Sequence, residues 1–258
     1  MLQLFRDAYG NRELIWTLAL TELKLRYKRS ALGFLWALFN PLLLMIVMTL
    51  VFSTLMRLSI KNYAIFLFSA LLPWTFFSQS LTYAVESIVG NGALLKKVRI
   101  ANSIFPVAAV LSNLINFLLS LVPLSLMLLP LKFPFHWTWL YLPVPLLTII
   151  LFALGCAFFC AAANVFFRDV THIIQIVLST WFYFSPVIYP WDIVPARYQW
   201  LFRLNPMLYI LNGFRLAIYQ GALPSAESIA ISLACGIGAL IVGFGFFSRY
   251  QNSFVFYV

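Results

Sequence analysis

Charged residues are scarce in this sequence. They make up 9% of the 258 residues, whereas 63% are hydrophobic, and the mean hydropathy is +0.95. So few charges cannot cover the surface of a soluble globule, which excludes that class. The composition instead predicts an all-α polytopic membrane protein.

The sequence also offers few side chains for chemistry. It has seven acidic residues, two histidines and three cysteines. His136 and His172 are predicted at opposite membrane faces, so they cannot share a metal ion, and no metal site or catalytic residue is predicted. Cys156, Cys160 and Cys235 lie within apolar runs, which indicates packing residues rather than disulfides or metal ligands.

The absence of certain motifs and ionisable residues counts against three functional classes. No G-x-x-x-x-G-K-[ST] loop occurs, so the chain does not hydrolyse ATP by that route. An ion-coupled carrier would need an ionisable group at mid-membrane, and none is found. A membrane enzyme acting on lipid-linked intermediates is an alternative, but it would need a cluster of His or carboxylates. Nucleic acid is not an expected partner, because the cations cluster between apolar runs.

Six charge-free runs are each long enough to cross a bilayer. At a rise of about 1.5 Å per residue, some twenty residues cover a hydrocarbon core of about 30 Å. The predicted spans are 34–56, 63–85, 104–131, 137–167, 173–191 and 228–248. They form one transmembrane domain over residues 1–258.

The positions of Lys and Arg predict the orientation. With a cytoplasmic amino terminus, the inner segments hold eleven of the 17 Lys and Arg residues, and the outer segments hold six. Since cytoplasmic loops carry the excess of these residues, both termini are predicted in the cytoplasm.

Residues 11–29 predict an amphipathic helix that lies in the membrane interface before the first span. Apolar residues recur at helical spacing, with Ile15, Trp16, Ala19, Leu20, Leu23 and Tyr27 on one face. We expect that face in lipid and the cations of the other face near anionic headgroups. The polar face is open to a cytoplasmic partner.

Residues 192–227 are too charged for an easy crossing and too long for an ordinary connection. Asn205-Pro206 divides the segment, and Gly221 and Pro224 end it. We expect two short re-entrant helices, near 196–204 and 207–219, that dip into the outer leaflet. A helical hairpin resting on the outer surface is the alternative.

Residues 90–102 predict a short basic helix with Leu94, Leu95 and Val98 on one side. A plain positive-inside loop is the simpler interpretation. The alternative is a helix that docks in a groove of a partner.

Aromatic residues and small residues lead to two further predictions, one for sugar binding and one for helix packing. Trp181 and Tyr183 lie near the middle of the fifth span, where their polar edges need partners, and such a lining suits a sugar. Small residues repeat every fourth position in the fourth and sixth runs, which predicts close packing of helices within the chain. Because six helices are few for a wide pathway, a homodimer with the pathway at its interface is expected.

Three stretches carry a family resemblance. Residues 23–41, LKLRYKRSALGFLWALFNP, closely resemble the opening signature of permease subunits of type-two ABC exporters. The most similar group moves lipid-linked O-antigen or wall teichoic acid. Asn205-Pro206 with Arg215 and Gly221 resembles the NP…R…G segment of that family. Residues 96–106, KKVRIANSIFP, resemble its basic loop, apart from Ala101-Asn102, where relatives often have Pro and a basic residue.

The resemblance implies an exporter subunit of the bacterial inner membrane. It would move a polyprenyl-diphosphate-linked, O-antigen-like polysaccharide, with a teichoic-acid or capsule polymer as alternatives. It implies a homodimer above two separate ABC ATPase subunits, which bind the ATP and Mg²⁺, while this chain holds no cofactor. The other partners are membrane lipids and the lipid-linked glycan.

The resemblance also implies site residues, and with it docking of 90–102 becomes the favoured interpretation. The residues expected to contact the ATPase are Arg12, Glu13, Glu22, Lys24, Lys28, Leu94, Leu95, Lys96, Lys97 and Arg99. The lipid diphosphate is expected at Arg26, Tyr27 and Arg29, although orientation and headgroup anchoring would equally explain the two arginines. The glycan channel is expected to include Trp36, Phe39, Trp181, Tyr183 and Phe184. The outer gate is expected to include Tyr189, Trp191, Arg203, Asn205, Pro206 and Arg215.

Overall fold

In the computed structural model, every regular element of the described residues is a helix, which confirms the all-α class. The structure describes residues 9–28, 30, 33–51, 60–97, 100–129 and 131–258. The α-helices are α2 (Arg12–Tyr27), α3 (Trp36–Thr49), α4 (Tyr63–Gly90), α5 (Gly92–Lys97), α6 (Ile104–Leu128), α7 (Pro143–Phe166), α8 (Val170–Phe184), α9 (Ala196–Arg203), α10 (Pro206–Arg215), α11 (Ala226–Tyr250) and α12 (Phe254–Tyr257).

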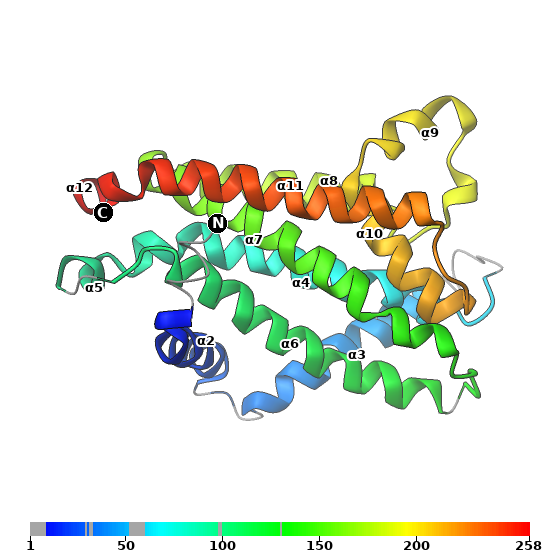
Figure 1. Ribbon diagram of the computed structural model, residues 1–258. Helices are drawn as coiled ribbons and strands as arrows, with labels where there is room; N and C mark the ends of the chain where they lie inside the picture. The colour runs from blue at the N-terminus through cyan, green and yellow to red at the C-terminus, as the bar shows by residue number, and fades with distance from the viewer. Residues whose placement is uncertain (1–8, 29, 31–32, 52–59, 98–99, 130) are drawn as a thin grey trace.

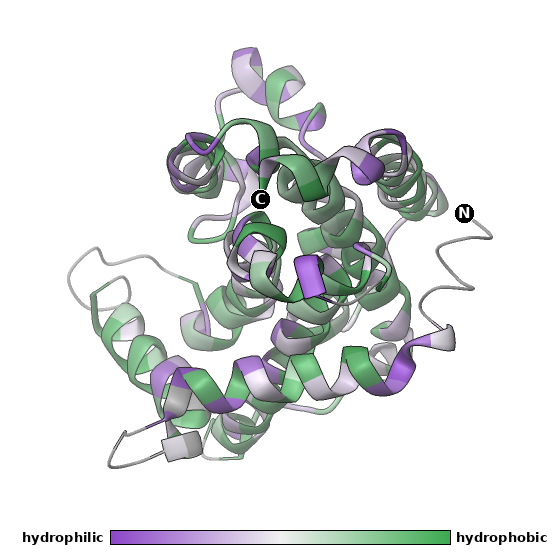
Figure 2. Cartoon of the chain, turned by 90° about the vertical axis from the view of Figure 1, so that its left-hand side faces the viewer, coloured by the Kyte–Doolittle hydropathy of each residue, from purple (hydrophilic) through white to green (hydrophobic). Residues whose placement is uncertain are grey.

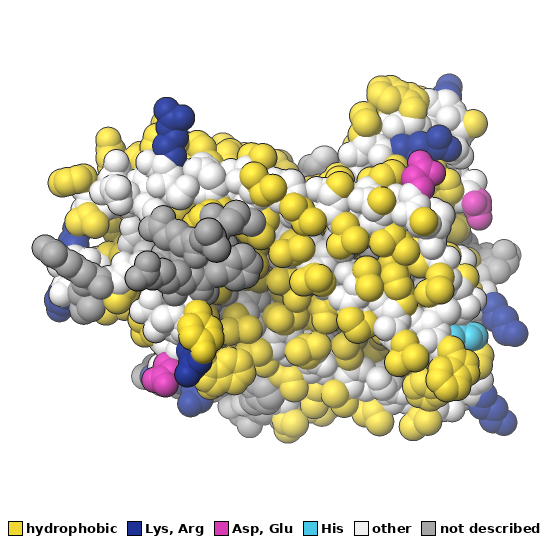
Figure 3. Space-filling model, viewed as in Figure 1, with side chains coloured by type: hydrophobic (Ala, Val, Ile, Leu, Met, Phe, Trp, Pro, Cys, Tyr) yellow, Lys and Arg dark blue, Asp and Glu magenta, His cyan; other side chains and the backbone are white. Residues whose placement is uncertain are grey.

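The long helices run side by side in one bundle (Figure 1). Helices α2, α5 and α12 lie at one end of the bundle, and α9 lies at the other. Figure 3 shows hydrophobic side chains over the middle of the viewed face, with charged side chains towards both ends. A bilayer requires this distribution, because a charged side chain is costly in hydrocarbon.

Four helical segments are long and apolar enough to cross a membrane, and they match predicted spans two, three, four and six. They are Tyr63–Lys97, Ile104–Leu128, Trp137–Phe166 and Ala226–Tyr257. The helices in predicted spans one and five, α3 and α8, are shorter. Residues 52–56, the end of the first predicted span, lie outside the described residues.

The fifth apolar run does not stay helical to its predicted end at Trp191. Helix α8 ends at Phe184, and the backbone of Ser185 is extended, with φ −107° and ψ 135°. Pro186 explains this end, because proline disfavours helical backbone at the residue before it and lacks the amide hydrogen that a helix needs. Tyr189 and Trp191 therefore lie in the connection to α9.

Helix α4 is the centre of the bundle. It packs against α3, α6, α7, α8 and α10. Nearly every side chain in its first half is buried. The first half of α4 is therefore enclosed by other helices, and three residues further along α4 or at its middle, Thr75, Gln79 and Tyr83, line the cavity described below.

Helices α7 and α11 approach each other closely at glycines. A Cβ atom added to Gly155 would overlap the backbone of Ala239, and one added to Gly243 would overlap the carbonyl group of Gly155. Small residues let two backbones come this near. This contact confirms the predicted role of the small residues in packing within the chain.

Gly243→Ala is expected to lower the melting temperature of the purified protein, because the added methyl group forces α7 and α11 apart. Overpacking of this kind costs about 1–3 kcal/mol. Gly238→Ala is the matched control on the same helix, since a Cβ atom there meets nothing within 4 Å. Equal melting temperatures of the two variants in detergent would contradict the close contact.

Candidate functional site

Helix α2 lies across one end of the bundle and has two different faces. Figure 1 shows it end-on, and Figure 2 shows it along its length, with hydrophilic and hydrophobic residues alternating. Ile15, Ala19 and Leu23 are buried, and the helix packs on α6. The expectation that these three lie in lipid is therefore wrong, because α6 covers them. Arg12, Glu13 and Lys24 of the helix are exposed, as is Lys28 directly after it.

Glu22 and Arg26 belong to a polar network that fastens α2 to α6. Arg26 donates from Nη1 to Asn113 Oδ1 at 2.8 Å and from Nη2 to Ser112 Oγ at 3.0 Å. Its guanidinium lies 3.6 Å from the centre of the Tyr83 ring. Ser112 Oγ donates to Glu22 Oε2 at 3.0 Å. Glu22, expected at the ATPase, therefore contacts its own chain.

Burial raises the pKa of the Glu22 carboxyl group. The hydrogen bond from Ser112 and the positive charge of Arg26 lower it, but their combined effect is smaller. A desolvated carboxyl group holds its proton more tightly because burial disfavours the charged form. The network thus contains a titratable group that the protein environment biases towards the neutral state.

The predicted mouth of the first span adjoins this network. Arg26 is part of it, and Tyr27 is the last residue of α2. Arg29 lies outside the described residues. Two of the three residues expected to bind the diphosphate, Arg26 and Tyr27, therefore belong to the last turn of α2, where Arg26 binds α6.

The short helix α5 presents its basic residues and buries part of its apolar side. Lys96 and Lys97 are exposed, and Leu94 is half-buried. Leu95 was expected on the contact surface, but its side chain is only 7% exposed and packs in a hydrophobic cluster of its own chain. Helix α12 and the end of α4 contact α5, which explains this burial. Arg99 lies outside the described residues.

Helices α3 and α8 pack on α4 and leave aromatic side chains uncovered. Tyr183 on α8 is 68% exposed, and Phe184 is also exposed. Trp36 and Phe39 on α3 are exposed as well. Four of the five aromatics expected in the channel therefore have accessible rings.

Trp181, the fifth of these aromatics, finds its polar partner inside the chain. Its Nε1 donates to Asn205 Oδ1 at 2.8 Å. Asn205 Nδ2 donates to the Phe184 carbonyl at 3.1 Å and to Ser185 Oγ at 3.0 Å. Asn205 Oδ1 also accepts from Met207 N at 3.0 Å and so caps α10. Asn205 thus joins the end of α8 to the start of α10.

Arg215 holds the same turn from the other end of α10. It is 6% exposed, and its Nη1 and Nη2 donate to the carbonyls of Pro186 and Val187 at 2.6 and 2.7 Å. Its guanidinium lies 3.9 Å from the centre of the Phe66 ring. Asn205 and Arg215, both expected in the outer gate, therefore fix the turn after α8 to α10.

The other residues expected in the outer gate lie around α9. The hydroxyl group of Tyr189 donates to the Tyr183 carbonyl at 2.7 Å, and Trp191 packs edge-on against Phe202. Arg203 is exposed at the end of α9, and Pro206 begins α10.

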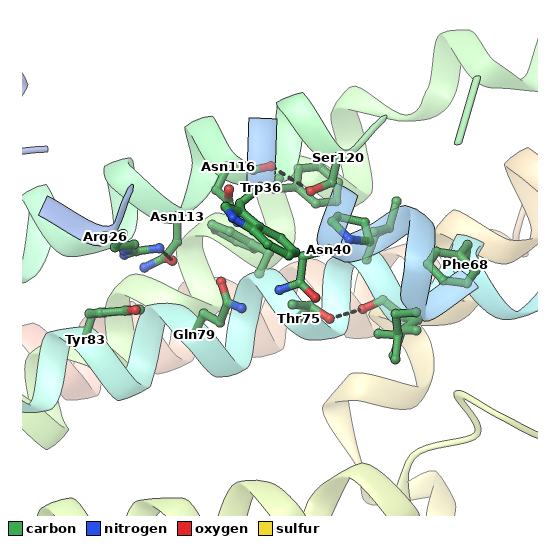
Figure 4. A pocket seen from close by; sticks show the side chains of 16 residues that line it. Arg26, Trp36, Asn40, Phe68, Thr75, Gln79, Tyr83, Asn113, Asn116 and Ser120 are labelled. Atoms are coloured by element: carbon green, nitrogen blue, oxygen red, sulfur yellow. Dashed lines mark hydrogen bonds between the residues drawn. The ribbon is translucent and has the colours of Figure 1, made fainter. Parts of the chain in front are cut away.

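A polar cavity between α3, α4 and α6 contains residues that the sequence analysis did not single out (Figure 4). We call it the amide slot; its volume is about 400 Å³, and its polar lining is Asn40, Thr75, Gln79, Asn113, Asn116 and Ser120. Trp36 lines it too, and Arg26 lies at one end. In the sequence these are single polar residues inside charge-free runs. Their helical spacing on α6 was the one available signal.

The sequence is similar to known export proteins over almost its whole length. It matches the ABC-2 type transporter family over residues 13–219. It is 36% identical over 258 residues to the O-antigen export system permease protein RfbA of Myxococcus xanthus, covering 98% of each chain. It is 30% identical over 237 residues to the protein of the same name in Klebsiella pneumoniae, covering 90% of each chain. The polysialic acid transport protein KpsM of Escherichia coli is 21% identical over 240 residues, covering 92% of this chain and 93% of that one.

Arg215→Met is expected to destabilise the protein, because two buried carbonyl groups lose a charged donor. Each such hydrogen bond contributes about 1.5–3 kcal/mol. The melting temperature of the detergent-solubilised protein measures the effect, and Arg203→Met is the control because Arg203 is exposed. If both variants melt together, Arg215 does not hold the turn after α8.

Glu22→Gln is expected to remove a pH dependence from the docking of α2. Folding raises the pKa of the Glu22 carboxyl group, so the protonated group contributes stability that is fully present below its ordinary pKa. This stabilisation is lost as the pH rises through the raised pKa of the folded protein. Glutamine stays neutral and can still accept from Ser112.

Amide hydrogen exchange of α2, corrected for intrinsic rates, measures this dependence between about pH 4 and pH 8. Protection in the wild type should fall with rising pH, and Glu22→Gln should flatten the change. Glu13→Gln on the exposed face is the control. A profile of Glu22→Gln that coincides with the wild type would refute the role of Glu22.

Proposed function

Because this chain belongs to the ABC-2 type transporter family, we propose that it is the membrane-spanning subunit of an ATP-driven exporter of a lipid-linked polysaccharide. Similarity to an O-antigen export permease over 98% of the chain carries the proposal. The substrate is then a polyprenyl-diphosphate-linked, O-antigen-like glycan that leaves the cytoplasmic side of the bacterial inner membrane. A capsule polymer is the second candidate, favoured by the 24% identity over 252 residues to the capsule polysaccharide export inner-membrane protein CtrC of Neisseria meningitidis; a teichoic-acid polymer is a further alternative.

The energy for transport comes from separate ATPase subunits, two for each exporter. The absence of a phosphate-binding loop from this sequence supports that division of labour. The exposed charges of α2 and the exposed Lys96 and Lys97 of α5 lie at the same end of the bundle and suit contact with such a partner.

Each subunit crosses the membrane six times, with both termini in the cytoplasm. Helices α3 and α8 supply the two crossings beyond the four long apolar segments. The end of the bundle that holds α2, α5 and α12 faces the cytoplasm, because most Lys and Arg residues are predicted there. Helices α9 and α10 then form the outer gate at the other end.

A homodimer encloses the glycan pathway. Helices α3 and α8 flank α4 and leave apolar surface uncovered, with Ile176 of α8 69% exposed. A second copy would cover such surface and place the aromatic side chains of α3 and α8 along the path. ATP binding closes the ATPase dimer, pushes on α2 and α5, and shifts α3 and α8 so that the interface opens.

The lipid diphosphate meets the cytoplasmic end of the first span at Arg26, Tyr27 and Arg29. Cations at this level attract phosphate groups. Arg26 also fastens α2 to α6, so its replacement disturbs both roles. Arg29→Ala is therefore the more direct test of diphosphate attraction, with assembly of the ATPase complex as its control.

Transport in proteoliposomes tests the proposed function. Vesicles with this chain and its ATPase should move a labelled lipid-linked glycan when ATP is added, and vesicles with the chain alone should move none. An imposed ion gradient should not replace ATP. Transport by the chain alone, or by an ion gradient, would rule out the proposal.

Charge reversal tests the ATPase contact within the same system. Lys96→Glu with Lys97→Glu should greatly reduce co-purification of the ATPase, because two exposed cations become anions. Lys132→Glu is the matched control, since Lys132 is also exposed but lies in the connection between α6 and α7, at the end of α6 remote from α5. Equal co-purification for both variants would remove α5 from the contact.

A further inference from the structure

The amide slot lies near the middle of two membrane-spanning helices, where polar side chains are costly. Asn116 is the central residue of α6, and Gln79 lies near the middle of α4. Both helices are among the segments long and apolar enough to span a membrane. An unpaired amide in hydrocarbon costs free energy, so polar groups at this depth face a partner or a pathway.

Some of the polar groups of the slot are already used by the chain. Thr75 Oγ1 donates to the Leu71 carbonyl at 2.8 Å, and Ser120 Oγ donates to the Asn116 carbonyl at 2.8 Å. Asn113 accepts from Arg26 at 2.8 Å. These hydrogen bonds leave the three side chains less available to a ligand.

Asn40 and Gln79 differ from these residues. Their side-chain amides make no hydrogen bond within the part of the chain that the structure describes, and Figure 4 shows both pointing into the cavity. Each carboxamide offers two donors and an acceptor. Two walls of the slot, α3 and α4, therefore present amide groups that a ligand can use.

The charge of the lining limits the ligand. None of the described residues that line the slot is acidic, so this lining does not suit a metal cation. Within the part of the lining that the structure describes, Arg26 is the one cation, and its guanidinium already contacts Ser112, Asn113 and the Tyr83 ring. The slot therefore favours a neutral ligand with many hydrogen-bonding groups.

Trp36 adds an apolar surface to these amides. Figure 4 shows its indole ring beside Asn40, along the same cavity. An aromatic face packs on the C–H face of a sugar ring, while neighbouring amides exchange hydrogen bonds with its hydroxyl groups. A cavity of about 400 Å³ lies at the small end of the range for ligand pockets, which suits one sugar residue.

We propose that the amide slot binds a single sugar residue of the exported glycan, with Asn40 and Gln79 as the hydrogen-bonding residues and Trp36 as the stacking surface. The proposal rests on the proposed function. It assigns sugar recognition to a place within one subunit, between α3, α4 and α6, in addition to the surface between two copies.

Protection of a cysteine from modification tests binding directly. Gln79→Cys is placed in a chain whose Cys156, Cys160 and Cys235 are replaced by Ala, and the chain is purified with its ATPase in lipid nanodiscs. A water-soluble thiosulfonate reagent should modify the new thiol. Lipid-linked glycan from cells that lack this chain should slow the modification about tenfold.

Undecaprenyl diphosphate without sugar is the control probe, and it should give no protection. Equal protection by this probe would identify a headgroup site and overturn the sugar assignment. If neither probe slows the modification, the cavity is hydrated but binds no sugar. If the thiol of an exporting protein is not modified at all, the cavity is closed to water. Either result also overturns the sugar assignment. Asn40→Cys on the opposite wall repeats the test if Gln79→Cys does not assemble.

Export by cells provides the second readout. The double variant Asn40→Leu with Gln79→Leu should reduce surface polysaccharide about tenfold, because apolar side chains cannot replace the lost hydrogen bonds. Co-purification of the ATPase should not change. Ser80→Ala is the matched control, because Ser80 follows Gln79 on α4 and is buried, but does not line the slot.

The two proposals fail in different ways. If deletion of the whole chain leaves surface polysaccharide unchanged, the proposed function fails. If deletion abolishes export but the double variant exports normally, the amide slot alone loses its role and the exporter assignment stands.

Discussion

The fold depends on the need to satisfy polar groups where no water is available. In hydrocarbon an unpaired backbone amide or carbonyl costs several kcal/mol, so the chain crosses as helices. Where a helix has to stop, side chains take over the task. At the end of α8, Asn205 and Arg215 bind the carbonyl groups of Phe184, Pro186 and Val187. These two polar side chains thus serve the backbone of the turn.

The same need explains why α2 is firmly attached to the bundle. Glu22 and Arg26 lie on one side of α2 and share Ser112 of α6 between them. Burying their charges costs free energy, and the hydrogen bonds of the network offset part of that cost. Arg26 also lies at one end of the amide slot, and its partner Asn113 lines the slot as well. A movement of α2 would therefore change the lining of the slot directly.

The packing of α3 and α8 contrasts with that of α4. Helix α4 is enclosed by other helices, whereas Leu178 is the one buried residue of α8. A helix with so much exposed apolar surface needs lipid or another protein surface beside it. In the proposed mechanism α3 and α8 are the helices that move, and both leave apolar side chains uncovered by the rest of the chain.

Sequence alone predicted the membrane class and the positions of the four long apolar helices, because long apolar runs have few alternatives in a bilayer. It also marked Asn205, Arg215 and the small residues of α7 and α11, whose local patterns are distinctive. It could not show that α8 stops at Phe184, that Leu95 joins the core, or that Glu22 faces α6. Those outcomes depend on contacts between residues far apart in the chain, such as Arg26 with Asn113. The amide slot is the clearest case. Asn40, Gln79 and Asn116 are far apart in the sequence and come from three helices, and the packing of these helices brings their amides to one cavity.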